Sequence, residues 1–207
     1  MAPRTPPDAT LRRGGAPAEP HSHLRIPPDE ELPEELVRLA DQSGFERMAL
    51  RAKGLRAESF LRFLRYVHGL LDPREGQLTR AERELIAVVV SAENRCTLCL
   101  LGHTRLLAGL IGDEGRAMRL AINHREVALS PRERALADFA QRLTAAPAEV
   151  ADADLQRLRD VGLDDEAIFE AIELAAVFNY TSRVAIATGS RVDDSYWTSR
   201  SDPSCTS

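Results

Sequence analysis

Apolar residues recur every three or four positions through most of the chain, which is the spacing of one face of an α-helix. The segment 57–71 shows this clearly, because its apolar residues form a single stripe. Earlier in the chain, Pro33 at a first helical position predicts a helix that ends before Gly44. No convincing pair of strands is present. The pattern therefore predicts an all-α domain.

Capping residues mark the starts of further helices. Helices are expected after Thr79, near Cys96 and after Asp113, Ser130, Asp152 or Asp154, and Asp164, and the last of them reaches about Thr188 before Gly189. Thr79 and Ser130 are each followed by Glu three residues later, which is a capping box. The β-branched run 85–90 could suggest a strand. The capping box before it favours instead a helix that is buried nearly all round.

Both ends of the chain lack the apolar residues that a core requires. Residues 1–22 are rich in Pro, Ala, Gly and Arg, and we expect a disordered tail with solvated His21 and His23 at its end. Residues 197–207 are polar and contain Cys205, which we interpret as incidental. The expected all-α domain therefore spans residues 23–196.

Composition and charge narrow the classes of function. Hydrophobic residues make up 43% of the 207, which is enough for one domain with a substantial core. The net charge of −5 indicates no nucleic-acid partner, and the excess of Arg over the single Lys53 is interpreted as coding bias. No apolar run approaches the roughly 20 residues of a membrane span, and no secretory signal is recognisable. We therefore expect a cytoplasmic protein without a membrane partner, in which a Cys-x-x-Cys motif is more often catalytic or metal-binding than structural.

The candidate chemistry lies in the stretch 96–103. On a helix, Cys96, Cys99 and His103 fall on one face, and Cys96 lies at the N-terminus, where unpaired amides favour a thiolate. A tight turn at residues 93–95 should join this helix to the preceding one in an antiparallel hairpin. Glu84 and His103 then both lie roughly 13–15 Å from the turn, at 1.5 Å of rise per residue. Glu84 is therefore expected to face His103, with Cys99 one helical turn nearer the connection and one water able to bridge the gap.

Each of these residues also has a simpler interpretation. Buried cysteines can be small hydrophobic side chains, but two at this spacing with a histidine on the same face favour a site. Glu84 could simply interact favourably with the positive end of the helix dipole. However, a carboxylate beside six apolar residues needs a partner. Glu93 is interpreted as a solvated turn residue. His68 and His124 have no acid or thiol at motif spacing and are interpreted as structural.

The pattern Glu-x11-Cys-x2-Cys-x3-His resembles the active site of the alkylhydroperoxidase D family, within the carboxymuconolactone decarboxylase-like superfamily. The resemblance covers most of residues 23–192, and the segments 78–92, 129–135 and 178–185 look like its peroxidase-related branch. It implies an AhpD-like helical bundle with the dithiol at the start of a helix in an antiparallel hairpin. One position departs from the family: alkylhydroperoxidase D has a second histidine immediately before the second cysteine, where this chain has Leu98.

What the resemblance implies is a peroxidase without haem, metal or other cofactor. Cys99 would be the peroxidatic thiol, with a pKa lowered from its ordinary value, and Cys96 would be the resolving thiol. His103 and Glu84 would relay the proton of Cys99. The substrate would be hydrogen peroxide or an organic hydroperoxide, and the reductant a dithiol of the thioredoxin or lipoyl type. The resemblance, together with apolar residues on more than one face of the 164–188 helix, favours a homo-oligomer: a dimer, trimer or hexamer.

Other functions stay open at this point. Cys96, Cys99, His103 and Glu84 are the ligand types of a zinc site, so the protein could bind a metal. It could also be a redox sensor with little turnover. A decarboxylase or isomerase of the same superfamily is a further alternative, although such members typically lack the dithiol.

Overall fold

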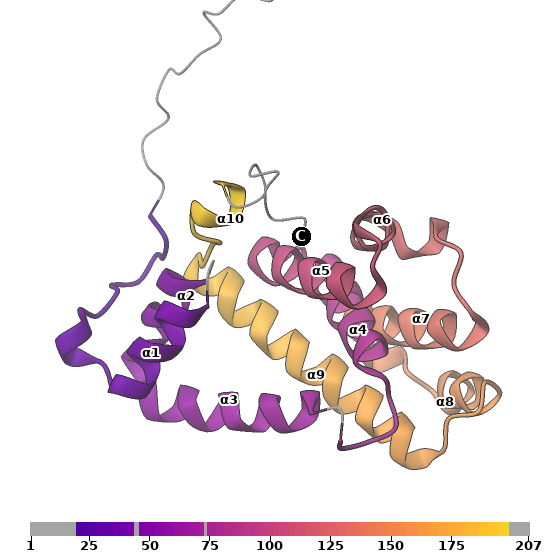
Figure 1. Cartoon of the computed structure of the whole chain (residues 1–207). Coiled ribbons are helices and arrows are strands. Elements are labelled where there is room, and N and C mark those ends of the chain that lie inside the picture. Colours follow the sequence, from indigo (N-terminus) through magenta and orange to yellow (C-terminus); the bar gives the residue numbers. More distant parts are fainter. Residues whose placement is uncertain (1–19, 44–45, 73, 199–207) are drawn as a thin grey trace, which may run out of the picture.

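The computed structural model describes residues 20–43, 46–72 and 74–198, and the regular elements of these residues are all helical (Figure 1). The α-helices are α1 (Glu34–Gln42), α2 (Arg47–Ala52), α3 (Ala57–Leu71), α4 (Arg80–Glu93), α5 (Thr97–Ile111), α6 (Glu114–Asn123), α7 (Pro131–Ala145), α8 (Asp152–Arg159), α9 (Asp165–Thr188) and α10 (Ser195–Thr198). Short 3₁₀ helices are η2 (Asp29–Glu31), η3 (Lys53–Arg56), η4 (His124–Glu126) and η5 (Pro147–Glu149). The prediction of an all-α fold is confirmed.

The long helix α9 runs through the middle of the molecule (Figure 1). In that view α1, α2 and α3 lie on one side of it, and α4 to α8 lie on the other. Helix α4 packs against α5, α7 and α9, so it forms the centre of the larger side. The two ends of α9 are fixed by local chemistry: the Asp164 side chain accepts the Ala167 amide, and Gly189 adopts the left-handed conformation that ends the helix, with φ of 65°.

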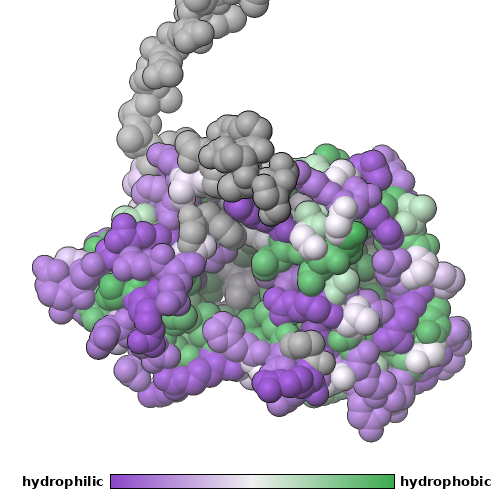
Figure 2. All heavy atoms as spheres, in the orientation of Figure 1, coloured by the Kyte–Doolittle hydropathy of each residue, from purple (hydrophilic) through white to green (hydrophobic). Residues whose placement is uncertain are grey.

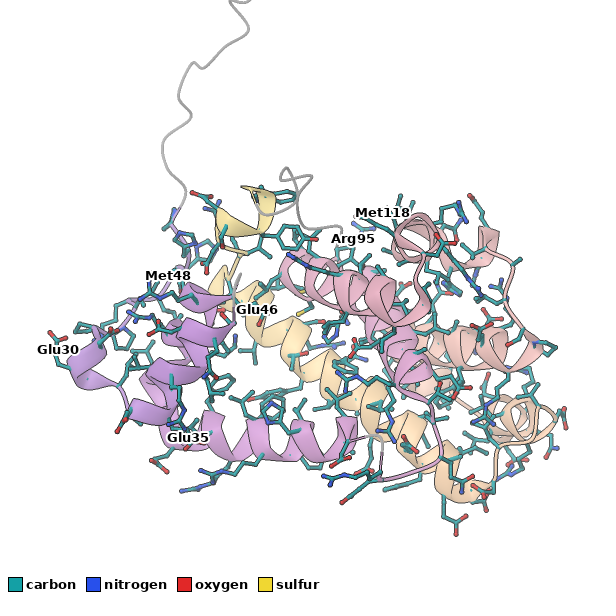
Figure 3. The ribbon with its side chains drawn as sticks, in the orientation of Figure 1. Glu30, Glu35, Glu46, Met48, Arg95 and Met118 are labelled. Atoms are coloured by element: carbon teal, nitrogen blue, oxygen red, sulfur yellow. The ribbon has the colours of Figure 1, made fainter. Side chains whose placement is uncertain are left out.

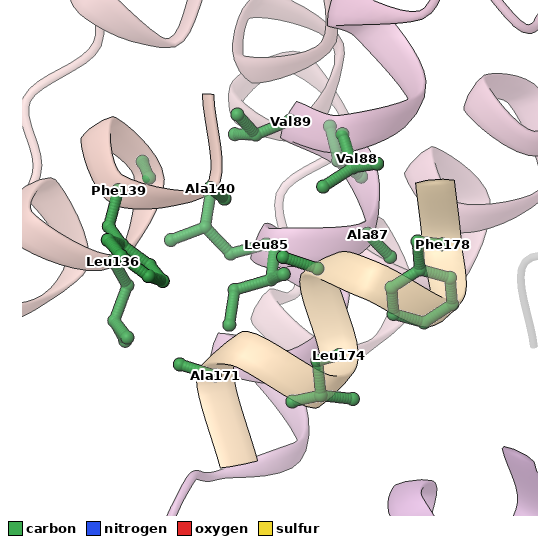
Figure 4. Close-up of a cluster of buried hydrophobic side chains, with 14 of the residues drawn as sticks. Leu85, Ala87, Val88, Val89, Leu136, Phe139, Ala140, Ala171, Leu174 and Phe178 are labelled. Carbon is green, nitrogen blue, oxygen red and sulfur yellow. The ribbon is translucent and has the colours of Figure 1, made fainter. Parts of the chain in front are cut away.

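The main hydrophobic core lies where α4, α7 and α9 meet (Figure 4). Leu85 and Val88 of α4 face Leu136 of α7 and Leu174 of α9, and all four side chains are buried. Every residue of α4 from 82 to 91 is buried, which explains why the sequence is apolar throughout 85–90. Burial of each large aliphatic side chain stabilises the fold by about 1.5–3 kcal/mol, so this contact fixes α4 firmly.

The expected capping boxes form at α4 and α7. The Glu82 amide donates to Thr79 Oγ1 at 3.2 Å, and the Thr79 amide donates to Glu82 Oε2 at 2.8 Å. Ser130 and Glu133 make the same pair of hydrogen bonds. These bonds satisfy amides that would otherwise have no partner at a helix start, which is why a local sequence signal places both helices correctly.

The N-terminal boundary at residue 22 is wrong. Ser22 is buried, and its hydroxyl donates to Thr188 O at 3.0 Å, where the His23 amide also donates at 2.7 Å. The last carbonyls of α9 have no partner inside the helix, so these two residues supply the missing donors. His21 is half-buried, 3.7 Å from Asp193, and is not fully solvated as expected. Residues 1–19 and the interpretation of their disorder lie outside the described residues.

At the other end, α10 extends to Thr198 and crosses the expected domain boundary at residue 196. Tyr196 is fully buried, which anchors this short helix beside α5. Cys205 lies outside the described residues. Within the described ranges, no helix combines the length and the apolar character needed to cross a bilayer.

Candidate active site

The two motif cysteines lie side by side at the start of α5. Cys96 is the N-cap residue of this helix, and Cys99 belongs to its first turn. Both thiols are free, and their sulfur atoms are 2.9 Å apart. The Cys99 amide points at Cys96 Sγ, 3.5 Å away, so the cap position gives that sulfur a backbone donor. A disulfide needs an S–S distance of about 2.05 Å, so little movement separates the reduced pair from a bond.

The α4–α5 connection explains why this geometry arises. Asn94 and Arg95 form the turn, and Arg95 has φ of 56°. The Cys96 amide donates to Ser91 O at 3.0 Å, which holds the start of α5 against the end of α4. The expected antiparallel hairpin is therefore present, with Cys96 directly after the turn. Figure 3 labels Arg95 at this end of the hairpin.

Glu84 and His103 meet across the hairpin, as the helical rise predicts. Glu84 Oε2 lies 2.8 Å from His103 Nδ1, and the carboxylate is fully buried at 0% exposure. An ionised carboxylate accepts, so Nδ1 carries the proton and Nε2 is the nitrogen left to exchange protons. The ring of Phe178 on α9 lies edge-on to the imidazole, with 4.7 Å between centroids, and fixes its orientation. Among the described residues, neither sulfur forms a hydrogen bond with His103.

Arg80 completes this carboxylate site, and the sequence analysis missed it. Its Nη2 lies 2.8 Å from Glu84 Oε1, an ion pair whose angles are not those of a hydrogen bond. Arg80 is one turn before Glu84 on the same face of α4, and i,i+4 spacing is the available signal. A buried carboxylate is costly without a partner, so Arg80 makes the charge on Glu84 tolerable.

The electrostatics of the dithiol differ from the expectation. The pKa of Cys96 is lowered to about 7, first because the S–H of Cys99 donates to its sulfur; burial opposes this effect, and the Cys99 amide, Ser182 and His103 add to it. The pKa of Cys99 is raised well above its ordinary value, because its thiol is the donor in this contact and is buried. The expected lowering of the Cys99 pKa is therefore wrong for the reduced pair, in which the negative charge lies on Cys96.

Several groups outside the motif surround the dithiol. Ser182 of α9 affects the pKa of both thiols. The charges of Glu46 and Lys53, the N-cap and C-cap residues of α2, also interact with the pair. Figure 3 shows Glu46 between α2 and α9. Cys96 also borders a cavity of about 650 Å³. The other lining residues of this cavity include His23, Arg95, Thr97, Ile186, Arg191 and Trp197.

The remaining candidates lie away from this site. His68 is exposed, and His124 is buried with Nε2 3.1 Å from Asp138, so both fit the structural interpretation. Glu93 is not a solvated turn residue: it ends α4 and accepts a hydrogen bond from Gln141 at 2.8 Å. In the described part of the chain, no three His, Cys, Asp or Glu side chains gather closely enough to hold a metal ion.

Proteins of known structure share this fold over almost the full length of the chain. The model of the carboxymuconolactone decarboxylase family matches residues 57–142. A structure from Ralstonia eutropha JMP134, described as an alkylhydroperoxidase AhpD core and an uncharacterized peroxidase-related protein, is 30% identical, covers 87% of this chain and 96% of its own, and has a TM-score of 0.77. An uncharacterized peroxidase-related protein from Silicibacter sp. TM1040 is 32% identical, covers 88% of this chain and 97% of its own, and has a TM-score of 0.78.

A more distant structure shares the fold alone. A cysteine-to-alanine variant of the debrominase Bmp8, solved in complex with 2,3,4-tribromopyrrole, is 16% identical, covers 86% of this chain and 97% of its own, and has a TM-score of 0.71. No curated protein matches the sequence. Identity of 30% or more over almost the full length of two peroxidase-related proteins, together with the family model, settles the family. The chain belongs to the AhpD-like carboxymuconolactone decarboxylase superfamily.

Proposed function

We propose that the protein is a thiol-dependent peroxidase, free of haem and metal, that reduces hydrogen peroxide or an organic hydroperoxide through a Cys96–Cys99 dithiol–disulfide cycle. The observation that carries the proposal is the pair of reduced sulfurs 2.9 Å apart, next to the buried Glu84–His103 pair. The peroxidase-related names of the two relatives support the same conclusion.

The first step oxidises one sulfur. A thiolate attacks one peroxide oxygen, so an S–O bond forms while the O–O bond breaks, and the sulfur becomes a sulfenic acid. The leaving oxygen takes one proton and departs as water or an alcohol. His103 is the proposed carrier of that proton, which the dithiol lost on ionisation, and Glu84 holds the imidazole in place. General acid–base transfer of this kind contributes typically 10²–10⁴-fold to a rate.

The second and third steps restore the site. The other thiol attacks the sulfenic sulfur, the S–S bond forms, and hydroxide takes the thiol proton and leaves as water. An external dithiol of the thioredoxin or lipoyl type then exchanges with the disulfide; two thiols are regenerated and the reductant leaves as its own disulfide. The cavity beside Cys96 favours that sulfur as the point of attack by the reductant.

We assign the attack on peroxide to Cys99, as the family resemblance implies, although the resting charge lies on Cys96. The two statements are compatible because the proton lies between sulfurs 2.9 Å apart. Its transfer from Cys99 to Cys96 moves the anion to Cys99 without any change in net charge. Cys99 is also the more exposed of the two, at 9% against 2%.

Peroxide consumption with a dithiol reductant tests the proposal. Wild type and Cys205→Ser should consume peroxide at the same rate, and Cys99→Ser should lose the activity. After one equivalent of peroxide, Cys96→Ser should trap a sulfenic acid on Cys99, and the wild type should carry a Cys96–Cys99 disulfide in its peptide map. Sulfenate on Cys96 in Cys99→Ser would reverse the two roles, and an unoxidised dithiol would refute the peroxidase.

The same samples address the alternatives. Metal analysis of the reduced protein detects a zinc site formed by the cysteines, His103 and Glu84. A redox sensor would form the disulfide once but would not turn over with reductant. A decarboxylase or isomerase would retain its activity when both thiols are alkylated.

A further inference from the structure

A fully buried hydroxyl from α9 lies against the dithiol. Ser182 is 0% exposed, and within the described part of the chain its Oγ has no hydrogen-bond partner of good geometry. Ala185, one turn further along α9, lies in the same buried cluster as Cys96 and Cys99, so this face of α9 packs on the dithiol. The hydroxyl adds to the Cys99 contact in lowering the pKa of Cys96, and it opposes the rise in the pKa of Cys99. A buried hydroxyl is costly unless it has a partner. An anion on either sulfur would supply the acceptor that Ser182 otherwise lacks.

The only lysine of the chain approaches the same dithiol from the other direction. Lys53 is the C-cap residue of α2, and its ammonium donates to Ala49 O at 3.3 Å and lies 5.4 Å from the centre of the Phe60 ring. Over the described residues, no carboxylate oxygen comes within 4 Å of it. Ala49 is fully buried in the same apolar cluster as Cys96 and Cys99, so the helical turn that carries the ammonium packs on the dithiol.

We propose that Ser182 and Lys53 form a second side of the dithiol site, which holds its negative charge: the hydroxyl donates to the anionic sulfur, and the ammonium is a positioning residue that balances the charge at longer range. Burial lowers the pKa of Lys53, and the charge of Glu46 and then those of the two cysteines oppose this effect. A thiolate beside Lys53 therefore adds to the negative charge that keeps this buried ammonium ionised. The inference concerns the dithiol of the proposed function, but it does not depend on peroxide turnover.

The other charged groups around the pair act in both directions. The Glu46 carboxylate adds to the Cys96 contact and burial in raising the pKa of Cys99, so it opposes an anion on that sulfur. It also opposes the lowering of the Lys53 pKa by burial, so it helps to keep the ammonium charged. His103, with Glu84 behind it, lowers the pKa of Cys96. Burial raises the pKa of Tyr196, which packs in the same cluster, so it stays neutral. Ser182 on α9 therefore favours the anion directly, and Lys53 at the end of α2 favours it through its charge at longer range.

Alkylation of the reduced protein as a function of pH, without peroxide, tests this inference. The rate at the Cys96 peptide has a midpoint at the pKa of that thiol, which is about 7. Ser182→Ala should raise the midpoint by about one pH unit, which at neutral pH slows alkylation several-fold. Lys53→Met should raise it by a smaller amount, because the ammonium acts at longer range. Lys53→Arg keeps the charge and should leave the midpoint in place.

Two further variants keep the test decisive. Ser91 is also fully buried without a partner for its hydroxyl, so Ser91→Ala controls for loss of a buried hydroxyl and should not move the midpoint. Glu46→Gln removes the opposing carboxylate and should lower the midpoint, which probes the same side of the site if Lys53→Met fails to fold. The inference is overturned if Ser182→Ala and Lys53→Met leave the midpoint unchanged, or if Ser91→Ala moves it as far. Because no peroxide is used, a protein without peroxidase activity can still pass.

Discussion

Replacement of Cys99 by alanine should raise the pKa of Cys96, because the S–H of Cys99 is the largest cause of its lowering. The pKa falls from 9.0 to about 7 in the folded chain. Two pH units correspond to about 3 kcal/mol in favour of the thiolate. At pH 7 about half of the Cys96 thiols are therefore ionised, against about one in a hundred for an unperturbed thiol. Without the donor, burial dominates, and the pKa should return to 9 or above.

Cys99→Ser is the matched variant. Its hydroxyl still donates to Cys96 Sγ from the same backbone position, so the pKa of Cys96 should stay near 7. Both variants leave Cys96 as the only thiol of the site. The measurement is the pH dependence of alkylation, read by mass spectrometry on the Cys96 peptide so that Cys205 is counted separately. Cys99→Ala should react many times more slowly than Cys99→Ser at pH 7 and at a similar rate near pH 10.

The two variants distinguish the effect of the Cys99 donor on the pKa of Cys96 from the effects of the other groups in the site. If Cys99→Ala keeps a midpoint near 7, the neighbouring thiol is not the cause, and the helix terminus with His103 must lower the pKa instead. If both variants rise together, Cys99 acts through a property that serine lacks, and a simple donor role is refuted.

Further predictions concern stability, the relay and assembly. The reduced protein should gain stability from pH 7 to pH 9 relative to the oxidised protein in chemical denaturation, because over this range the unfolded chain binds the Cys96 proton and the folded chain, with its lower pKa, does not. Glu84→Gln should preserve the fold and slow peroxide reduction at least tenfold at neutral pH but much less at alkaline pH in stopped-flow assays; an equal loss at every pH would mean that the residue only supports the fold. Arg80→Gln leaves the buried carboxylate with His103 alone and should lower the free energy of unfolding by about 1–3 kcal/mol, and an unchanged denaturation midpoint would contradict the ion pair. Large apolar side chains are exposed on α3, α5, α6 and α9, and Figure 2 shows such side chains among charged ones, so light scattering should detect a homo-oligomer; a 22.8 kDa particle would refute this.

The parts of the site that sequence could predict depend on local rules. Capping boxes place the starts of α4 and α7, because the side chains and the amides that they satisfy are three residues apart. The contact of Glu84 with His103 follows from counting residues from the tight turn along each helix. Both helices rise by the same distance per residue, so residues at similar counts from the turn lie side by side across the hairpin. The prediction succeeds because the connection is too short to allow another register.

The parts of the site that the sequence could not predict depend on tertiary packing. Helix α2 has only six residues and weak periodicity, so neither its existence nor its position on the dithiol can be inferred from spacing. Ser182 lies near the dithiol because α9 packs on α4 and α5, with Ala185 in the same buried cluster as Cys96 and Cys99. The reversed pKa order has a different origin: spacing shows that Cys96 and Cys99 are neighbours, but not which sulfur donates. That depends on the backbone amide that points at Cys96.

The charges around the dithiol favour retention of a proton in the proposed relay. Arg80 and Lys53 are positive, while Glu84, Glu46 and the singly ionised dithiol are negative, which leaves one negative charge in excess when His103 is neutral. Buried charges are costly unless they are balanced, so the site favours retention of the proton that the dithiol releases. His103 Nε2 is the nitrogen free to take it, since Nδ1 is committed to the carboxylate. In the proposed mechanism, the proton that leaves the thiol would then be held beside the sulfurs, where the departing oxygen of a peroxide needs it.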